Sequence, residues 1–190
     1  MNRLSLLQKM AMTNVQLLEF TFKVSNRRGD YRENVAIEAA KEGHLFIIQW
    51  MYANHIYTGD PCLIAAAEYG HINILDWLHN NRSDGKYLQC TVESLWENAI
   101  KNNHLPVIDW LRKKKLVPRL TTRYTAYTGN VETLEYLIKL GYYCNVGACK
   151  RIMSQSCAVE MGASNDSTKV LHKWTKYSEY LDRIASIPSL

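Results

Sequence analysis

The sequence is poor in glycine and proline and has no long hydrophobic run. Only 9 of the 190 residues are glycine and 4 are proline, which argues against a loop-rich all-β fold and against a long flexible linker. No stretch approaches the roughly 18 apolar residues that a membrane-spanning helix needs. Gln8, Lys9 and Gln16 interrupt the first apolar segment, so we expect neither a signal peptide nor membrane association.

Disulfide bonds are not expected either. The cysteines are odd in number and widely spaced: Cys62, Cys90, Cys144, Cys149 and Cys157. Without an export signal, this pattern predicts reduced thiols and a cytoplasmic location, with the nucleus as the other candidate. The remaining composition is ordinary for one globular domain, with 47% hydrophobic residues and a net charge of +5. We expect a monomer with a mildly basic surface.

A block of sequence recurs along the chain. Residues 38–54 read EAAKEGHLFIIQWMYAN, and residues 65–81 read AAAEYGHINILDWLHNN. Weaker copies follow at 99–111 and 125–137, and NVQLLEF at 14–20 matches NVETLEY at 130–136. An alanine marker aligns Ala40, Ala67, Ala99 and Ala126. The His or Asn marker after the turn steps by 30, 27, 33 and 26 residues, a regularity that indicates a stacked repeat array.

Each copy predicts two short helices. In the second clear copy the first helix covers 61–69, Gly70 breaks it because glycine tolerates positive φ, and the second helix begins near His71. Pro106 and Glu132 fall in the first turns of the corresponding later helices. The missing N–H of proline costs little in a first turn, and a negative charge there is favoured by the helix dipole. Helices this short are marginal alone, so we expect neighbouring pairs to bury each other's apolar faces.

The block A-A-x-x-G-H-[LI]-x-x-[IL]-x-W-[ML] at 39–51 and 66–78 resembles the ankyrin repeat. Residues 140–146, LGYYCNV, resemble the segment that follows an ankyrin second helix. The tryptophan-bearing form with irregular lengths is most similar to ankyrin-type proteins of giant and other large DNA viruses. The resemblance implies an all-α solenoid of five to six helical hairpins and a non-catalytic protein-binding scaffold. The viral similarity implies a host protein as partner and the host cytoplasm as location.

The sequence also departs from that family. No copy has its Thr-Pro-Leu-His opening, and copies that step by 26 or 27 residues are shorter than the usual ~33, so we expect shortened β-hairpin fingers. Residues 18–24 alternate as a strand would, but their overlap with the 14–20 match favours a helix. We place an ankyrin-like array at 1–148, with copies near 1–25, 33–55, 61–81, 93–116 and 121–144, and a divergent terminal repeat or cap at 149–190. Its last helix opens at Ser167, contains Val170, Leu171, Trp174 and Tyr177, and ends before Pro188.

Two surfaces are candidates for binding. The first consists of polar and aromatic residues that the resemblance places on first helices and loops: Tyr31, Arg32, Glu38, Tyr57, Tyr69, Tyr87, Lys101, Arg123 and Tyr127. The alternative is a basic ridge for nucleic acid or an acidic partner, formed if stacking aligns the cations after each second helix: Arg27, Arg28, Arg82, Arg112, Lys113, Lys114 and Lys115. We favour the simpler interpretation that these cations complement helix C-terminal dipoles.

The histidines do not point to a metal site. His44, His71 and His104 recur once per copy, and stacking would separate them by a layer of ~8–10 Å, too far to share one zinc ion. We expect them to cap the turn between the two helices through hydrogen bonds.

The cysteines give a second zinc hypothesis. Cys144, Cys149 and Cys157, with His172 further on, do not have the spacing of paired zinc knuckles, and we favour scattered thiols. The sequence has no glycine-rich phosphate loop and no nucleophile elbow. We therefore expect no catalytic residue, metal or cofactor.

Overall fold

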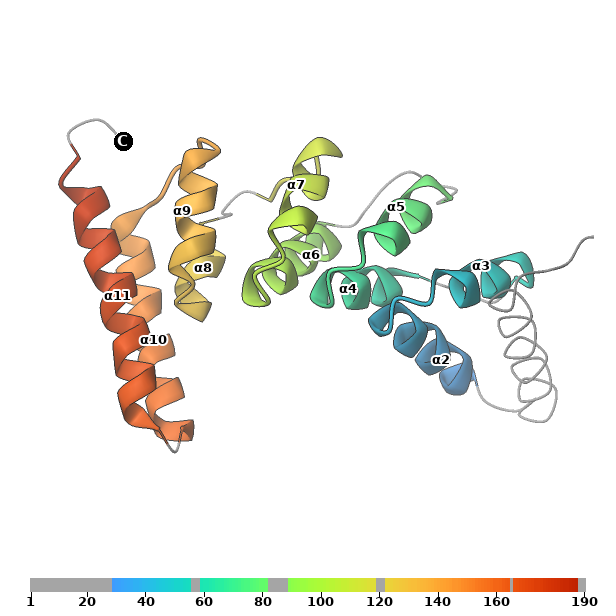
Figure 1. Cartoon of the computed structure of the whole chain (residues 1–190), viewed down its shortest axis with the longest axis horizontal. Coiled ribbons are helices and arrows are strands. Elements are labelled where there is room, and N and C mark those ends of the chain that lie inside the picture. The colour runs from blue at the N-terminus through green and yellow to red at the C-terminus, as the bar shows by residue number, and fades with distance from the viewer. Residues whose placement is uncertain (1–28, 56–58, 82–88, 119–121, 165, 188–190) are drawn as a thin grey trace, which may run out of the picture. The chain divides into compact units, whose positions relative to one another are not determined.

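The computed structural model describes residues 29–55, 59–81, 89–118, 122–164 and 166–187, with the side chains of residues 29–33, 89 and 90 left out. All regular structure in these ranges is α-helical and no strand occurs in them (Figure 1), so the all-α prediction is confirmed for this part of the chain. The expected copy at 1–25 and the ambiguous segment 18–24 lie outside it. No helix within these ranges is both long enough and apolar enough to cross a bilayer.

The chain forms two compact units, Met1–Lys86 and Tyr87–Leu190. The first contains α2 (Gly29–Lys41), α3 (Leu45–Ala53), α4 (Asp60–Glu68) and α5 (Ile72–Asn80). Here α2 packs against α3 and α4, α4 packs against α5, and α3 contacts α5. The unit therefore contains two helical hairpins side by side, first helix against first helix and second against second.

The second unit contains α6 (Gln89–Lys101), α7 (Leu105–Lys113), α8 (Arg123–Thr128), α9 (Val131–Lys139), α10 (Val146–Ala163) and α11 (Ser167–Ala185). The first helices α6, α8 and α10 pack in that order, and α11 covers α10 and contacts α9. The predicted last helix is confirmed, since it begins at Ser167 and ends before Pro188. Val170, Trp174 and Tyr177 are buried in it, whereas Leu171 is 57% exposed.

The turns inside the four described hairpins that precede α10 share one backbone feature. One residue is left-handed in each turn: Gly43 (φ 76°), Gly70 (80°), Asn103 (57°) and Gly129 (66°). In the first three turns the next N–H donates to the carbonyl five residues back at 2.8 Å, the bond that closes a Schellman cap. The second helix that follows is nine residues long in all four cases. The prediction that Gly70 breaks the helix is confirmed.

The same positions of each hairpin are buried. The two residues that stand four and three positions before the left-handed residue are at most 4% exposed in each hairpin: Ala39 and Ala40, Ala66 and Ala67, Ala99 and Ile100, Thr125 and Ala126. The fourth and seventh positions of the second helices are at most 6% exposed: Ile48 and Met51, Leu75 and Leu78, Ile108 and Leu111, Leu134 and Leu137. Ala99 therefore occupies the place of Ala39, not that of Ala40 as the sequence alignment had it, because this copy has only one alanine of the pair.

The tryptophan markers also occupy equivalent places. Trp50, Trp77 and Trp110 are each the sixth residue of their helix, as Tyr136 is in α9. The carbonyls of Trp50 and Trp77 both accept a hydrogen bond of 2.8 Å from the asparagine four residues later. In the first unit, the Trp77 ring also makes a T-shaped contact with the Tyr52 ring of the preceding hairpin, with centroids 5.2 Å apart.

The predicted capping by the histidines is seen at His71, but at the turn of the preceding hairpin. His44, His71 and His104 are N-cap residues, but none of their side chains caps its own helix. The His71 ring instead donates from Nε2 to the Lys41 carbonyl at the end of the preceding first helix, at 2.7 Å. In the first unit, the Gly-His pair thus joins one hairpin to the next.

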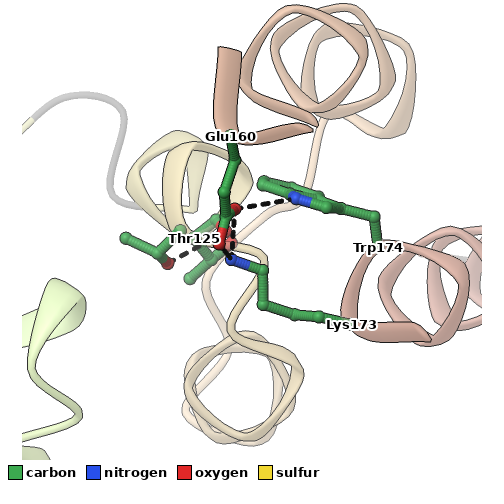
Figure 2. Close-up of polar contacts among 5 residues, drawn as sticks. Thr125, Glu160, Lys173 and Trp174 are labelled. Carbon is green, nitrogen blue, oxygen red and sulfur yellow. Dashed lines mark hydrogen bonds and ion pairs between the residues drawn. The ribbon is translucent and has the colours of Figure 1, made fainter. Parts of the chain in front are cut away.

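Polar contacts join α10 to α11 in the terminal hairpin (Figure 2). Glu160 of α10 accepts hydrogen bonds from the Lys173 ammonium, at 2.6 Å for Oε1, and from Trp174 Nε1, at 2.9 Å. The Lys173 ammonium also lies 4.8 Å from the centroid of the Trp174 ring, close enough for a cation–π contact. These contacts explain the three side chains structurally, so we assign them no binding role.

Candidate partner-binding groove

Two neighbouring first helices of the second unit form an open groove. Its walls are Glu93, Ser94 and Glu97 from α6 and Tyr124 and Tyr127 from α8, and its volume is about 380 Å³. We call this the α6–α8 groove. Two independent structural facts produce it: α6 and α8 pack side by side, and both turn their small or apolar residues toward the core.

The helical period places the two carboxylates together. Leu95, Trp96, Ala99 and Ile100 occupy the core face of α6 and are fully buried. Glu93 and Glu97 are four residues apart, one turn along a different face; Glu97 is exposed and Glu93 is half-buried. Like charges at this spacing destabilise a helix slightly.

The charges of these two carboxylates act on Tyr124, on the opposite wall of the groove. Burial raises the pKa of Tyr124, and the negative charges of Glu93 and Glu97 raise it further, with Arg123 acting in the opposite sense. Tyr127 is 51% exposed, so much of its side chain is open to a ligand. Carboxylates favour cationic donors through charge-assisted hydrogen bonds, and tyrosine rings favour cations on their faces. The groove therefore suits a lysine or arginine side chain.

Three residues predicted for partner binding lie on these two helices, and one lines the groove. Tyr127 is that residue. Lys101 is exposed at the end of α6, outside the lining. Arg123 is half-buried, and its Nε is buried without a hydrogen-bond partner among the described residues. Its positive charge lowers the pKa of the buried Cys149 thiol. The Arg123 guanidinium therefore also acts on a group in the core.

The remaining predicted residues belong to the first unit or fall outside the description. Glu38 and Tyr69 are exposed, and Glu38 forms an ion pair with Lys41 at 2.7 Å. That hydrogen bond is the main reason why the pKa of Lys41 is raised. The side chains of Tyr31, Arg32, Tyr57 and Tyr87 lie outside the described residues.

Sequence reasoning missed most of the groove. Glu93, Ser94, Glu97 and Tyr124 were not among the candidates, although the first two acids in this part of the chain are four residues apart. That spacing was the available signal. Both carboxylates fall inside the copy expected near 93–116, but apart from Glu38 the candidates were chosen among tyrosines and cations, and the neighbouring helix that supplies Tyr124 is not visible in the sequence.

The structure describes one part of the predicted basic ridge, the cluster at the end of α7. Arg112, Lys113 and Lys115 are exposed at the end of α7, and Arg112 lies 3.8 Å from Asp109. The Lys114 ammonium is 5.8 Å from the centroid of the Trp110 ring. The other predicted members, Arg27, Arg28 and Arg82, lie outside the described residues.

Only two of the four residues in the zinc hypothesis lie close together. Cys144 Sγ lies 3.9 Å from Cys149 Sγ, while Cys157 is two helical turns beyond Cys149 on α10 and His172 is exposed on α11. Within the described ranges, no three His, Cys, Asp or Glu side chains converge as a metal site.

Comparison with known proteins leaves function to the geometry. No family model matches the chain, and neither a curated protein nor a solved structure matches it. The groove and the repeated hairpins are therefore the observations from which function is inferred.

Proposed function

We propose that this chain is a non-catalytic protein-interaction module built as an ankyrin-like solenoid with short connections. Four hairpins with a left-handed residue at the same place in the turn and one pattern of burial support the repeat architecture. Such arrays use the faces of their repeats to bind other proteins. The viral resemblance in the sequence extends the proposal to a host protein as partner and the host cytoplasm as location.

The α6–α8 groove is the observation that carries this proposal. It combines two carboxylates with two tyrosines on adjacent first helices, and aromatic residues are favoured contacts at protein interfaces. The chemistry of the groove selects a partner segment with an exposed lysine or arginine. The cation would lie between the carboxylates of α6 and the rings of α8.

Selection from a random peptide library tests the proposal directly. Peptides that bind the full chain should be enriched in lysine and arginine, and Glu93→Gln with Glu97→Gln should weaken them about tenfold or more, because each hydrogen bond to a charged group contributes about 1.5–3 kcal/mol. Tyr127→Ala should also weaken them.

Glu179→Gln is the matched control, since Glu179 is exposed on α11 and does not line the groove. It should leave affinity unchanged. Binders that ignore the double glutamine variant would show that the α6–α8 groove is not the site. A library that yields no binders at all would count against the interaction module itself.

The cationic end of α7 supports a second candidate, nucleic-acid binding. Lys113 and Lys115 are exposed and form no ion pair with a described residue. Several phosphate contacts would make affinity fall steeply between about 50 and 200 mM salt, and Lys113→Glu with Lys114→Glu should abolish binding. Absence of binding to single and double strands at low salt would exclude this function.

A further inference from the structure

Two cysteine thiols meet where the chain enters α10. Cys144 lies in the connection after α9, and Cys149 lies in the first turns of α10. Between them, Asn145 caps the helix by accepting a hydrogen bond from the Ala148 N–H at 2.9 Å. This cap turns the chain back on itself, and it brings the two sulfur atoms to 3.9 Å. Both cysteines are free thiols.

One thiol faces a cavity and the other is buried. Cys144 is half-buried and lines a cavity of about 290 Å³, together with Tyr142, Val146 and Ile184. Cys149 has no exposed surface and belongs to the core cluster that contains Tyr177. Of the two thiols, Cys144 is therefore the one that a small reactant in this cavity meets.

The surroundings shift the two thiol pKa values in opposite directions. The hydrogen bond from Cys144, a hydrogen bond from the Tyr177 hydroxyl and the charge of Arg123 lower the pKa of Cys149, although burial opposes them. The hydrogen bond to Cys149, and then burial, raise the pKa of Cys144. Because the two titrations belong to the pair, one ionisation is shared between two forms. In one form a Cys149 thiolate accepts the Cys144 S–H at 3.9 Å, and in the other the charge lies on Cys144 while the Cys149 S–H donates to the Thr122 carbonyl at 3.9 Å.

We propose that Cys144 and Cys149 are a peroxide-reactive dithiol that closes into an intramolecular disulfide. The proton between the sulfurs moves to Cys149, and the Cys144 thiolate attacks one oxygen of the hydroperoxide. The O–O bond breaks, leaving a Cys144 sulfenic acid and hydroxide, and hydroxide takes the proton from Cys149 to form water. The Cys149 thiolate then attacks Cys144 Sγ, the S–O bond breaks, and a second hydroxide leaves.

The overall reaction of the singly ionised pair with hydrogen peroxide gives one disulfide, one water and one hydroxide. The two cysteine sulfurs are oxidised and the peroxide oxygens are reduced. The sulfurs must approach from 3.9 Å to about 2.05 Å. The proposal is independent of partner binding, because neither cysteine lines the α6–α8 groove.

The sequence offers a direct readout. Trypsin cuts after Lys139 and Lys150, so both cysteines fall in the single peptide 140–150. After treatment of the folded full chain with hydrogen peroxide and alkylation of remaining thiols, this peptide should carry no alkyl group and lack two hydrogen atoms. Reduction with dithiothreitol should restore both alkylation sites.

Three variants separate the steps. Cys149→Ser should stop at the Cys144 sulfenic acid, which dimedone traps, and Cys144→Ser should leave Cys149 unoxidised in the folded chain. Cys157→Ser is the control, since Cys157 is half-buried on the same helix and should leave disulfide closure unchanged. Circular dichroism verifies that each variant is folded.

Two results would overturn the proposal. One is a peroxide-treated wild-type chain in which peptide 140–150 keeps both alkylation sites. The other is a disulfide that joins either cysteine to Cys157 or to a second chain. If Cys149→Ser gave no dimedone adduct on Cys144, the assignment of Cys144 as the residue that meets peroxide would be wrong.

Discussion

The missing side chain of Gly43 allows two hairpins of the first unit to touch. Gly43 has φ of 76°, and a Cβ placed there would lie 2.7 Å from Cε1 of His71. Gly43→Ala therefore combines a left-handed alanine, which costs roughly 1–2 kcal/mol, with displacement of the His71 ring from the Lys41 carbonyl. We expect a loss of roughly 2 kcal/mol or more in urea unfolding.

Two other glycines separate the backbone cost of Gly43→Ala from the cost of displacing His71. Gly141 has φ of 86° but nothing within 4 Å of its added Cβ, so Gly141→Ala should show the backbone cost alone. Gly162 lies inside α10 with open space around it, and Gly162→Ala should stabilise by about 0.5–1 kcal/mol. An equal loss for Gly43→Ala and Gly141→Ala would show that the contact with His71 contributes nothing.

Asp166 gives the terminal helix a pH dependence. Its carboxylate accepts hydrogen bonds from the Thr168 hydroxyl, the Lys169 ammonium and the Lys169 N–H, and these lower its pKa below 3.8. A lowered folded pKa means that the stabilisation is complete above the unfolded value and is lost as pH falls through the folded value. Asp166→Asn keeps a capping side chain but cannot titrate in this range.

The stability difference between wild type and Asp166→Asn should therefore be constant near neutral pH and shrink below pH 3.8. Urea unfolding at a series of pH values, followed by circular dichroism, measures it. A difference that persists unchanged into this acid range would mean that the charge of Asp166 has no role in capping α11.

At the scale of elements, the hairpin of α10 and α11 depends on one acceptor. Trp174 is only 3% exposed, and Glu160 accepts its Nε1–H at 2.9 Å. The Lys173 and Glu160 side chains are 36% and 40% exposed, so solvent weakens their ion pair, and Glu160→Gln should cost at most about 1 kcal/mol. Glu160→Ala also leaves the buried indole N–H unpaired, which should add about 1–3 kcal/mol.

Denaturation of both variants distinguishes the two contacts. A similar loss for Glu160→Gln and Glu160→Ala would show that the ion pair with Lys173, not the indole hydrogen bond, fastens this hairpin. The comparison is a matched one because glutamine retains the side-chain length and one acceptor oxygen.

The elements that sequence could predict were those set by local rules. Gly70, Pro106 and Glu132 act within one or two turns of their own position, and the structure has the corresponding breaks and first turns where they were expected. The length of α10 was not anticipated. Glycine marks the end of a helix in several other turns, but Gly147 and Gly162 both lie inside α10.

Contacts between neighbouring hairpins were harder to predict. The hydrogen bond from His71 reaches a residue 30 positions earlier, so the histidine signal was visible while its partner was not. The α6–α8 groove likewise joins residues of two hairpins, and the approach of Cys144 to Cys149 depends on the Asn145 cap. Periodicity predicts which residues lie in a layer, but not which side chains of adjacent layers touch.

At the scale of the whole molecule, the proposed repeat architecture predicts that stability is a sum of local terms, because each hairpin of such a stack contacts only its neighbours. Leu75 and Leu134 test this because they form a matched pair. Each is the fourth residue of a nine-residue second helix, one in each compact unit, and each is completely buried. Truncation of a buried leucine to alanine costs about 2–5 kcal/mol.

Hydrogen exchange of Leu75→Ala and Leu134→Ala should therefore show two different patterns. Leu75→Ala should lower amide protection within α2 to α5, and Leu134→Ala within α6 to α11, with the largest change in the hairpin that carries the substitution and in its neighbours. A repeat array behaves this way because a cavity in one layer removes contacts only from the layers beside it. If either variant lowered protection equally throughout both units, the chain would unfold as one cooperative body, and the repeat architecture would no longer explain its stability.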